Sequence, residues 1–144
     1  MPKYRCVVAI PTRELYSGEV DYASIPGIDG DYGVLSGHES FVGLNRAGLL
    51  TLWLDAEGKD KQTFLVSGGV TQVLNNHLSV LPRYGCTLDE IDVEEVKSDI
   101  AALELEVEEV KREYDKSDDA VLETLAENKA WFEAQLKFKG ESSR

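Results

Sequence analysis

The residue types that could take part in chemistry gather in one glycine-rich segment, Pro26–His38 (PGIDGDYGVLSGH). It contains two carboxylates, Asp29 and Asp31, and it ends in one of the two histidines of the chain. Glycine permits the positive φ angles that tight reversals need, so we expect a structured loop between two strands, with function on or beside it. The glycines in question are Gly27, Gly30, Gly33 and Gly37.

These residues do not form a recognisable catalytic motif. The glycine spacing in Pro26–His38 is similar to a phosphate-binding repeat, but no helix is predicted directly behind it to offer its N-terminus to an anion. The chain has no GxSxG, no Walker sequence and no cluster with metal-ligand spacing, so nothing supplies a nucleophile, a base and oxyanion donors together. We therefore expect no catalytic residue and no metal site. Asp29 and Asp31 are either turn residues or partner contacts, and His38 either bonds within the loop or contacts a partner.

Charge divides the chain into two predicted modules. The 144 residues are 42% hydrophobic, which supports an ordered core. Residues 1–86 carry 9 acidic and 7 basic side chains, whereas residues 87–144 carry 18 and 8. The total of −12 repels phosphate backbones and anionic lipid, so nucleic acid and direct headgroup binding are disfavoured. Protein partners are the expectation.

Cysteine usage and hydropathy indicate the compartment. Cys6 and Cys86 match no metal-binding spacing and could form at most one disulfide, so we favour a reduced cytosolic setting. The N-terminus has too short an apolar stretch for a signal peptide and lacks the composition of a transit peptide. No stretch approaches the roughly 20 apolar residues of a membrane span. We expect no membrane insertion, and action from the water side.

Residues 1–86 are predicted to form an antiparallel β-sandwich. Short β-favouring runs alternate with turn residues, and such close spacing leaves no room for parallel crossovers. Asp55–Asp60 is predicted to be a hairpin loop, and Asn75 with Asn76 suits a two-residue turn. The predicted strands are 4–10, 15–20, 21–25, 41–44, 49–54, 62–66, 70–74 and 77–81.

Residues 87–144 are predicted to form an antiparallel helical hairpin. Asp92 is expected to be the N-cap of the first helix, with Glu95 in the capping-box position. From Val93 onward, apolar residues recur at steps of three and four, which is the seam of a packed helix. The members of this seam are Val96, Ile100, Leu103, Val107, Val110 and Tyr114.

A second helix is predicted from about residue 120 to 138, after polar turn formers at 116–119. One face of it presents Leu122, Leu125, Phe132 and Leu136. Two amphipathic helices bury only one narrow seam against each other, so the remaining apolar positions need a further surface. These positions include Val121, Trp131 and Phe138. The fold class is thus α+β, an N-terminal sandwich followed by a C-terminal helical hairpin.

Four segments in order resemble the epsilon subunit of bacterial and chloroplast F-type ATP synthase. They are LYSGEV, IPGIDGDYGVLSGH, FLVSGGVTQVLNN followed by LSVL, and EID at the start of the hairpin. The resemblance implies a non-catalytic central-stalk subunit that couples ion flow through the c-ring to ATP synthesis. It implies a sandwich that binds the gamma subunit and rests on the c-ring. It also implies a regulatory hairpin that contacts the alpha and beta subunits and inhibits ATP hydrolysis, and a peripheral position on the cytoplasmic face of the bacterial plasma membrane.

The resemblance also assigns a partner interface. In the family, an acidic residue next to glycine in this loop touches the c-ring, and Gly30 with Asp31 stands there. The histidine that ends the loop lies toward gamma, and here it is His38. Gly33 of the same loop completes the predicted interface. The family usually continues Pro-Gly-His-Ala-Pro, whereas this chain has Ser-Gly-His-Glu-Ser at 36–40, so we expect a more mobile loop and an altered gamma contact.

Nucleotide binding and strong inhibition are not expected. Some relatives begin the first helix Ile-Asp-x-x-Arg-Ala, a motif associated with ATP; this chain keeps Ile91 and Asp92 but has Glu95 in place of arginine. An acid where a cation should meet phosphate argues against an ATP site, so no cofactor is predicted. Residues 87–144 carry a net charge of −10. This charge weakens the attraction of the hairpin to the acidic segment of the beta subunit that the hairpin contacts in the family. Basic residues near the end keep modest inhibition open: Lys129, Lys137, Lys139 and Arg144.

One alternative stays open from the sequence alone. An unrelated adaptor could combine a sandwich head with a helical arm and bind protein partners other than gamma and the c-ring. Copurification with the gamma subunit separates the two hypotheses.

Overall fold

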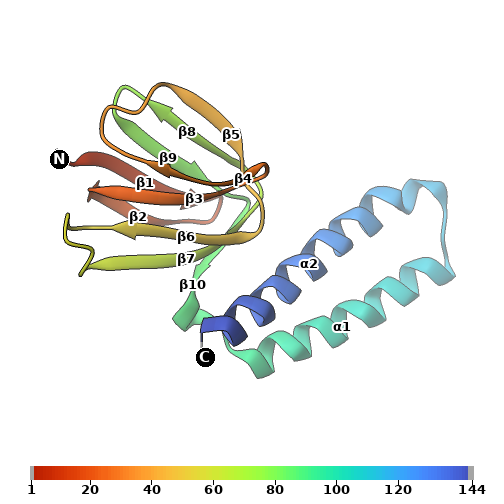
Figure 1. Ribbon diagram of the computed structural model, residues 1–144. Coiled ribbons are helices and arrows are strands. Elements are labelled where there is room, and N and C mark those ends of the chain that lie inside the picture. Colours follow the sequence, from red (N-terminus) through yellow and green to blue (C-terminus); the bar gives the residue numbers. More distant parts are fainter. Residues whose placement is uncertain (1, 143–144) are drawn as a thin grey trace. The chain divides into compact units, whose positions relative to one another are not determined.

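The computed structural model describes residues 2–142 and contains two compact units, which meet between Leu88 and Asp89 in the sequence (Figure 1). The first unit is a β-sandwich, and the second is a helical hairpin. This confirms the predicted fold class.

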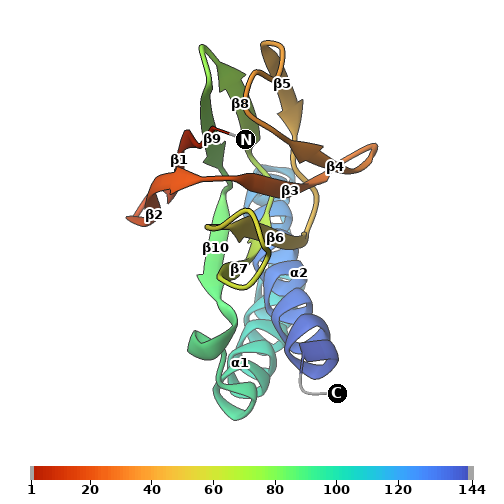
Figure 2. The same cartoon turned by 60° about the vertical axis from the view of Figure 1, so that its left-hand side comes forward.

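Within residues 2–142 the sandwich consists of two five-stranded sheets. The first sheet has the order β2-β1-β9-β8-β5, and the second has the order β10-β7-β6-β3-β4 (Figures 1 and 2). The strands of the first sheet are β1 (Tyr4–Ile10), β2 (Arg13–Val20), β5 (Phe41–Leu44), β8 (Val70–Leu74) and β9 (His77–Leu81). Those of the second are β3 (Tyr22–Gly27), β4 (Gly30–Val34), β6 (Gly48–Trp53), β7 (Lys61–Ser67) and β10 (Tyr84–Thr87).

Three features of the sandwich depart from the sequence-based expectation. β1 pairs with β9 in parallel, so the pairing is not purely antiparallel. The long separation between these strands supplies the crossover that a parallel pair needs. β4 lies inside the segment that was predicted to be loop, because its glycines still pair their backbone with β3. β10 was not among the predicted strands, and it pairs with β7.

The core lies between the two sheets and follows the period-two alternation of strands. In β6, for example, every second side chain is buried, including Leu50 and Leu52. Two buried hydroxyls are hydrogen-bonded: that of Tyr4 donates to Val34 O at 2.7 Å, and that of Thr71 donates to Asn45 Oδ1 at 2.6 Å. The buried hydrophobic cluster is Tyr4, Cys6, Val8, Val20, Ala23, Ile25, Val34, Leu50, Leu52, Phe64, Val66, Val73, Leu78 and Val80.

The turns that connect these strands use the expected residues. Asn75 and Asn76 have φ angles of 50° and 61°, which confirms the predicted two-residue turn. The β6–β7 hairpin loop closes through Leu54 N–H to Asp60 O at 2.8 Å, and Gly58 within it has φ 74°.

The second unit comprises a 3₁₀ turn (Leu88–Glu90, of which Leu88 belongs to the sandwich), α1 (Val93–Arg112), a 3₁₀ turn (Lys116–Asp118) and α2 (Asp119–Ser142). Figures 1 and 2 show α1 and α2 side by side as a hairpin. The Asp92 carboxylate accepts hydrogen bonds from the amides of Glu94 and Glu95 at 3.0 and 3.2 Å. This confirms Asp92 as the N-cap of α1.

The seam between the helices is narrow. Val96, Leu103 and Leu125 are buried, whereas Leu105 and Val121 are 66% and 46% exposed. Lys129 of α2 forms an ion pair with Glu104 of α1 at 3.4 Å.

Tyr114 was wrongly assigned to the α1 seam. α1 ends at Arg112, and Tyr114 is half exposed. Its hydroxyl donates to the Asp119 carboxylate at the start of α2, and this bond raises the pKa of Tyr114. No helix in the described part of the chain is both long enough and apolar enough to cross a membrane.

Candidate partner-binding surface

The glycine-rich segment forms the hairpin of β3 and β4. Gly27 pairs with Gly30, and Ile28 with Asp29 makes the two-residue turn between them. Gly30 has φ 128°, a conformation that side chains with a Cβ rarely adopt. The Ile28 amide donates to Leu44 O at 2.9 Å, so the turn rests on the end of β5. The tip of this hairpin is therefore a positioned element rather than a slack loop.

The four glycines of this segment have two different roles. Gly30 and Gly37 have positive φ angles, as predicted, but Gly27 and Gly33 do not. The latter two lie in strands and are needed for space instead. A Cβ on Gly33 would lie 2.0 Å from the Tyr22 hydroxyl, and one on Gly27 would lie 2.7 Å from Gly30 O. Gly33 therefore lets the Tyr22 ring cross β4.

Asp31 forms an ion pair that the sequence did not reveal. Its carboxylate accepts a hydrogen bond from the Arg46 guanidinium, and both side chains are about half exposed. The Arg46 amide also donates to Pro26 O at 2.9 Å, which fixes the backbone of Arg46 beside the hairpin. At this exposure the pair adds little to stability. Its effect is to offset the negative charge that Asp31 presents.

His38 lies at the other end of the segment, in the connection to β5. The His38 amide donates to Leu35 O at 3.1 Å, and His38 Nδ1 lies 2.9 Å from Glu39 O. The imidazole is exposed, with its centroid 6.4 Å from the Phe41 ring. Phe41 in turn meets Tyr32 edge to face at 5.2 Å. The histidine thus bonds within its loop and still presents its ring to solvent.

A shallow hollow of about 430 Å³ joins these elements. Gly30, Asp31 and His38, three of the four residues predicted for the interface, line it together. Gly33 does not line it, because Gly33 lies against Tyr22 instead. The other lining residues are Gly27, Ile28, Asp29, Tyr32, Phe41, Gly43 and Leu44.

An exposed apolar surface lies on the outside of the first sheet. We call it the outer apolar face and define it as Val42, Leu44, Leu74 and Leu81, which are 42% to 64% exposed. The strand register places them together: Val70 of β8 pairs with Leu44 of β5 on one side and with Leu81 of β9 on the other. Side chains directly opposite each other point to the same face of a sheet. Because Leu44 belongs to both, this face is continuous with the hollow.

Sequence reasoning assigned these strands but missed the outer apolar face. The signal lay in neighbouring apolar residues within a strand, such as Val73 with Leu74 and Val80 with Leu81. Consecutive apolar residues point to opposite faces, so one of each pair must be exposed or covered by something else. Val73 and Val80 are buried, and their neighbours are exposed. Grouped exposed apolar side chains of this kind mark interaction sites.

At the start of α1, where some relatives have the ATP-associated motif, this chain has three carboxylates. Asp92 is engaged by the helix N-terminus, and Glu94 and Glu95 are exposed beside it. Across residues 2–142, no three His, Cys, Asp or Glu side chains are grouped so that they could hold a metal ion.

Comparison with known proteins gives a consistent answer. The family model described as "ATP synthase, Delta/Epsilon chain, beta-sandwich domain" matches residues 3–83. The ATP synthase epsilon chain of Rhodopseudomonas palustris (strain BisB18) is 34% identical over 72% of this chain and 75% of its own length. That of Nitrobacter winogradskyi is 37% identical over 65% of this chain and 67% of its own length.

Solved structures share the fold. A chain in the cryo-EM structure of the Euglena gracilis mitochondrial ATP synthase (OSCP/F1/c-ring) superposes with a TM-score of 0.62 at 21% identity. It covers 99% of this chain and 82% of its own length. A chain in the Tetrahymena thermophila mitochondrial ATP synthase central stalk/c-ring gives 0.52 at 16% identity, covering 62% of this chain and 69% of its own length.

A two-sheet β-sandwich followed by a helical hairpin places the chain in the α+β class of proteins. The match over residues 3–83 and the relatives above 30% identity make the particular family clear. The chain belongs to the ATP synthase delta/epsilon chain family. This membership decides against the alternative of an unrelated adaptor.

Proposed function

We propose that this chain is a non-catalytic rotor subunit of the central stalk of a proton-translocating F-type ATP synthase, where it couples ion flow through the c-ring to ATP synthesis. It acts as a peripheral subunit on the cytoplasmic face of a bacterial plasma membrane. The match of residues 3–83 to the ATP synthase delta/epsilon family carries the proposal, and the outer apolar face lies on this matched part of the chain. Exposed apolar surfaces of this kind mark interaction sites, and the occupant proposed for this one is a protein partner.

The gamma subunit is the proposed partner of the outer apolar face. Val42 and Leu44 on β5 are the most exposed members, and His38 lies three residues before β5. Burial of such side chains against gamma supplies the driving force, at roughly 25 cal/mol per Å² of apolar area. The c-ring is the proposed partner of the β3–β4 tip, where Gly30 and Asp31 are exposed. Here Arg46 reduces the charge available for that contact.

The hairpin is proposed as a regulatory element with modest inhibitory strength on ATP hydrolysis. Of its four basic residues near the end, Lys129 is engaged with Glu104 at 3.4 Å and lies 3.9 Å from Glu133. Lys137 lies over the Phe138 ring at 5.2 Å, and Arg144 is outside the described residues. An already paired Lys129 offers less attraction to an acidic segment of the beta subunit.

Binding of the full-length chain to purified gamma subunit tests the proposal. We expect copurification, and we expect the Val42→Asp/Leu44→Asp double variant to bind at least about tenfold more weakly, because burying two carboxylates is costly. Thr12→Asp/Gln62→Asp is the matched control, since it also adds two acids, at exposed positions outside the outer apolar face. Retained binding by V42D/L44D, or absence of binding by the unaltered chain, would contradict the proposal.

A further inference from the structure

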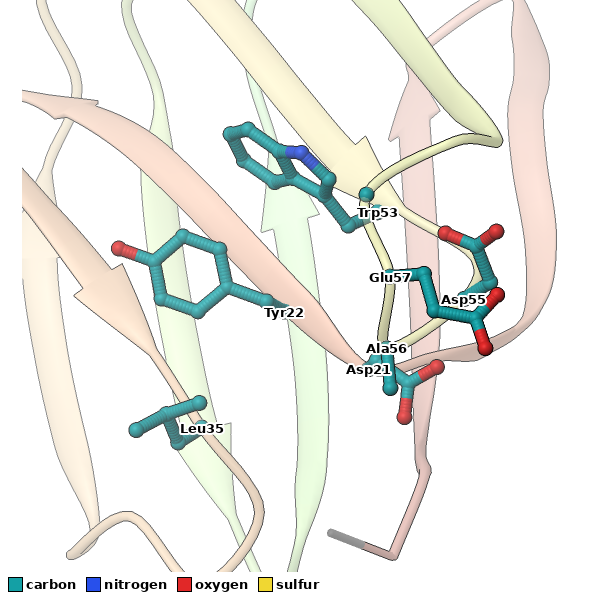
Figure 3. A pocket seen from close by; sticks show the side chains of 8 residues that line it. Asp21, Tyr22, Leu35, Trp53, Asp55, Ala56 and Glu57 are labelled. Atoms are coloured by element: carbon teal, nitrogen blue, oxygen red, sulfur yellow. The ribbon is translucent and has the colours of Figure 1, made fainter.

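A second cavity lies in the sandwich and shares no residue with the outer apolar face or the β3–β4 hollow. It has a volume of about 360 Å³ and lies where β3 begins and β6 ends (Figure 3). Its lining residues come from three elements: Asp21 and Tyr22, Leu35 after β4, and Trp53 with Asp55, Ala56, Glu57 and Gly58 of the β6–β7 loop.

One wall of the cavity is aromatic. Tyr22 and Trp53 pair across β3 and β6, and their ring centroids are 5.1 Å apart at an interplanar angle of 56°. The absence of a side chain at Gly33 makes room for the Tyr22 ring, as described above. Both rings are half-buried, so part of each remains available to a ligand. An aromatic face carries negative electrostatic potential and attracts cations.

The remaining polar lining is acidic. Asp55 is held in place, because its Oδ1 accepts hydrogen bonds from the amides of Lys59 and Asp60 at 2.9 and 3.2 Å. Glu57 projects from the same loop and is exposed. The Asp21 side chain is only 9% exposed, yet it lines the cavity. Figure 3 shows these carboxylates near the loop, and the two rings with Leu35 on the other side.

The chain itself already places one cation at this rim. Lys3 Nζ lies 3.7 Å from Asp21 Oδ2 and donates a hydrogen bond to Leu54 O. Among the described residues, neither Asp55 nor Glu57 forms an ion pair. The lining therefore keeps a net negative charge after Lys3 is counted. A neutral or anionic ligand gains nothing from that charge.

We propose that this cavity binds an arginine side chain from a partner polypeptide. The planar guanidinium stacks on Tyr22 or Trp53 and donates to the carboxylates of Asp55 and Glu57, while its aliphatic stem lies against Leu35. Arginine suits the site better than lysine because it is planar, more weakly hydrated and able to form bidentate bonds with carboxylates. This contact is separate from the proposed gamma and c-ring surfaces and does not depend on them.

Nuclear magnetic resonance of the full-length chain tests the proposal directly. The chain has two tryptophans, so the indole N–H signal of Trp53 reports on the cavity and that of Trp131 is an internal control. The probes are acetyl-Gly-Arg-Gly-amide and its citrulline analogue, which has nearly the same shape without the charge. We expect a saturable shift of the Trp53 signal with the arginine peptide, about fivefold weaker affinity for citrulline, and no saturable shift at Trp131.

Variants of the lining acids then identify the site. Asp55→Asn/Glu57→Gln is expected to weaken arginine-peptide binding by about three- to tenfold, because two charge-assisted contacts are lost. Glu94→Gln/Glu95→Gln in the hairpin is the matched control and should leave the affinity unchanged. Retained tryptophan and amide spectra show that each variant is folded. Equal affinity for both peptides, no saturable shift, or no effect of D55N/E57Q would overturn the proposal.

Discussion

The sandwich and the hairpin differ in how completely each buries its own apolar residues. In the sandwich, side chains such as Leu52 and Val80 are fully buried between two sheets. In the hairpin, Leu103 and Leu125 are buried, but Leu105 and Val121 are largely exposed. A two-layer sandwich supplies a core of its own, whereas two helices share only one seam. The sandwich therefore encloses its own core, whereas the hairpin leaves apolar side chains available for a further contact.

A leucine-to-alanine substitution in each unit should show the largest difference between them in the loss of free energy of unfolding. Leu52→Ala removes a fully buried side chain, and we expect it to lower the free energy of unfolding of the sandwich by about 4 kcal/mol. Leu103→Ala, in the narrow seam, should lower that of the hairpin by only about 2 kcal/mol. Trp53 fluorescence in a Trp131→Phe background reports on the sandwich, and Trp131 fluorescence in a Trp53→Phe background reports on the hairpin. Equal losses of free energy in the two variants would contradict the conclusion that the sandwich buries its apolar residues more completely than the hairpin.

The second-largest effect is expected at alkaline pH, which should lower the free energy of unfolding of the sandwich. Burial raises the pKa of the Cys6 thiol to about 12, and burial also raises the pKa of the Tyr4 hydroxyl. Both groups hold their protons more tightly when folded, so their stabilisation is complete below the unfolded pKa and is lost as pH rises toward the folded pKa. For Cys6 this window runs from about 9 to about 12.

We expect the free energy of unfolding of the sandwich to fall across that window by up to about 1.4 kcal/mol per pH unit for each such group. Denaturant titrations at several pH values, followed by Trp53 fluorescence, measure the slope. Cys6→Ala should make the slope shallower, at the cost of some stability at every pH. A flat profile above pH 9 would show that these groups are not protected by the fold.

A smaller effect is expected at the start of the hairpin. Asp92→Ala removes the carboxylate that accepts two amide hydrogen bonds at the N-terminus of α1, and should cost about 1 kcal/mol. Hydrogen exchange of the Glu94 and Glu95 amides measures this locally. Faster exchange there with unchanged exchange in β6 is the expected result. Asp92→Asn, which keeps a capping oxygen, should restore most of the protection.

The smallest effect is expected for the ion pair between the helices. Glu104→Gln removes the partner of Lys129 on the other helix, and since both side chains are about half exposed the loss should be about 0.5 kcal/mol. Thermal unfolding of the hairpin, followed by Trp131 fluorescence, measures it. Glu106→Gln, another exposed acid of α1, is the control. A loss above about 1.5 kcal/mol would mean that this pair, rather than the apolar seam, holds the helices together.

The sequence predicted the features that depend on nearby residues. The helical period from Val93 onward and the cap at Asp92 are local patterns, and both are confirmed apart from Tyr114. The Asn75–Asn76 turn is local as well. β4 was missed because glycine is rare in strands and its pairing with β3 is decided by the fold. The parallel pairing of β1 and β9 depends on residues about seventy positions apart.

The candidate surface was predictable only in part. Gly30, Asp31 and His38 were identified and do line one hollow, but whether partners bind there stays a prediction. The Arg46 partner of Asp31 lies fifteen residues away, and nothing in the local pattern indicates it. The outer apolar face required the register of β5, β8 and β9, because exposure of Leu44 or Leu81 depends on which face of the sheet is covered.

Proton-driven ATP synthesis by a reconstituted complex tests the division of roles most directly. A complex that lacks this chain is supplied with the full-length chain carrying either Val42→Asp/Leu44→Asp in the sandwich or Leu105→Asp/Val121→Asp in the hairpin. Each variant replaces two exposed apolar side chains by acids. We expect the hairpin variant to restore coupled synthesis and the sandwich variant not to restore it. Restoration by the sandwich variant, or failure of the hairpin variant alone, would contradict this division of roles.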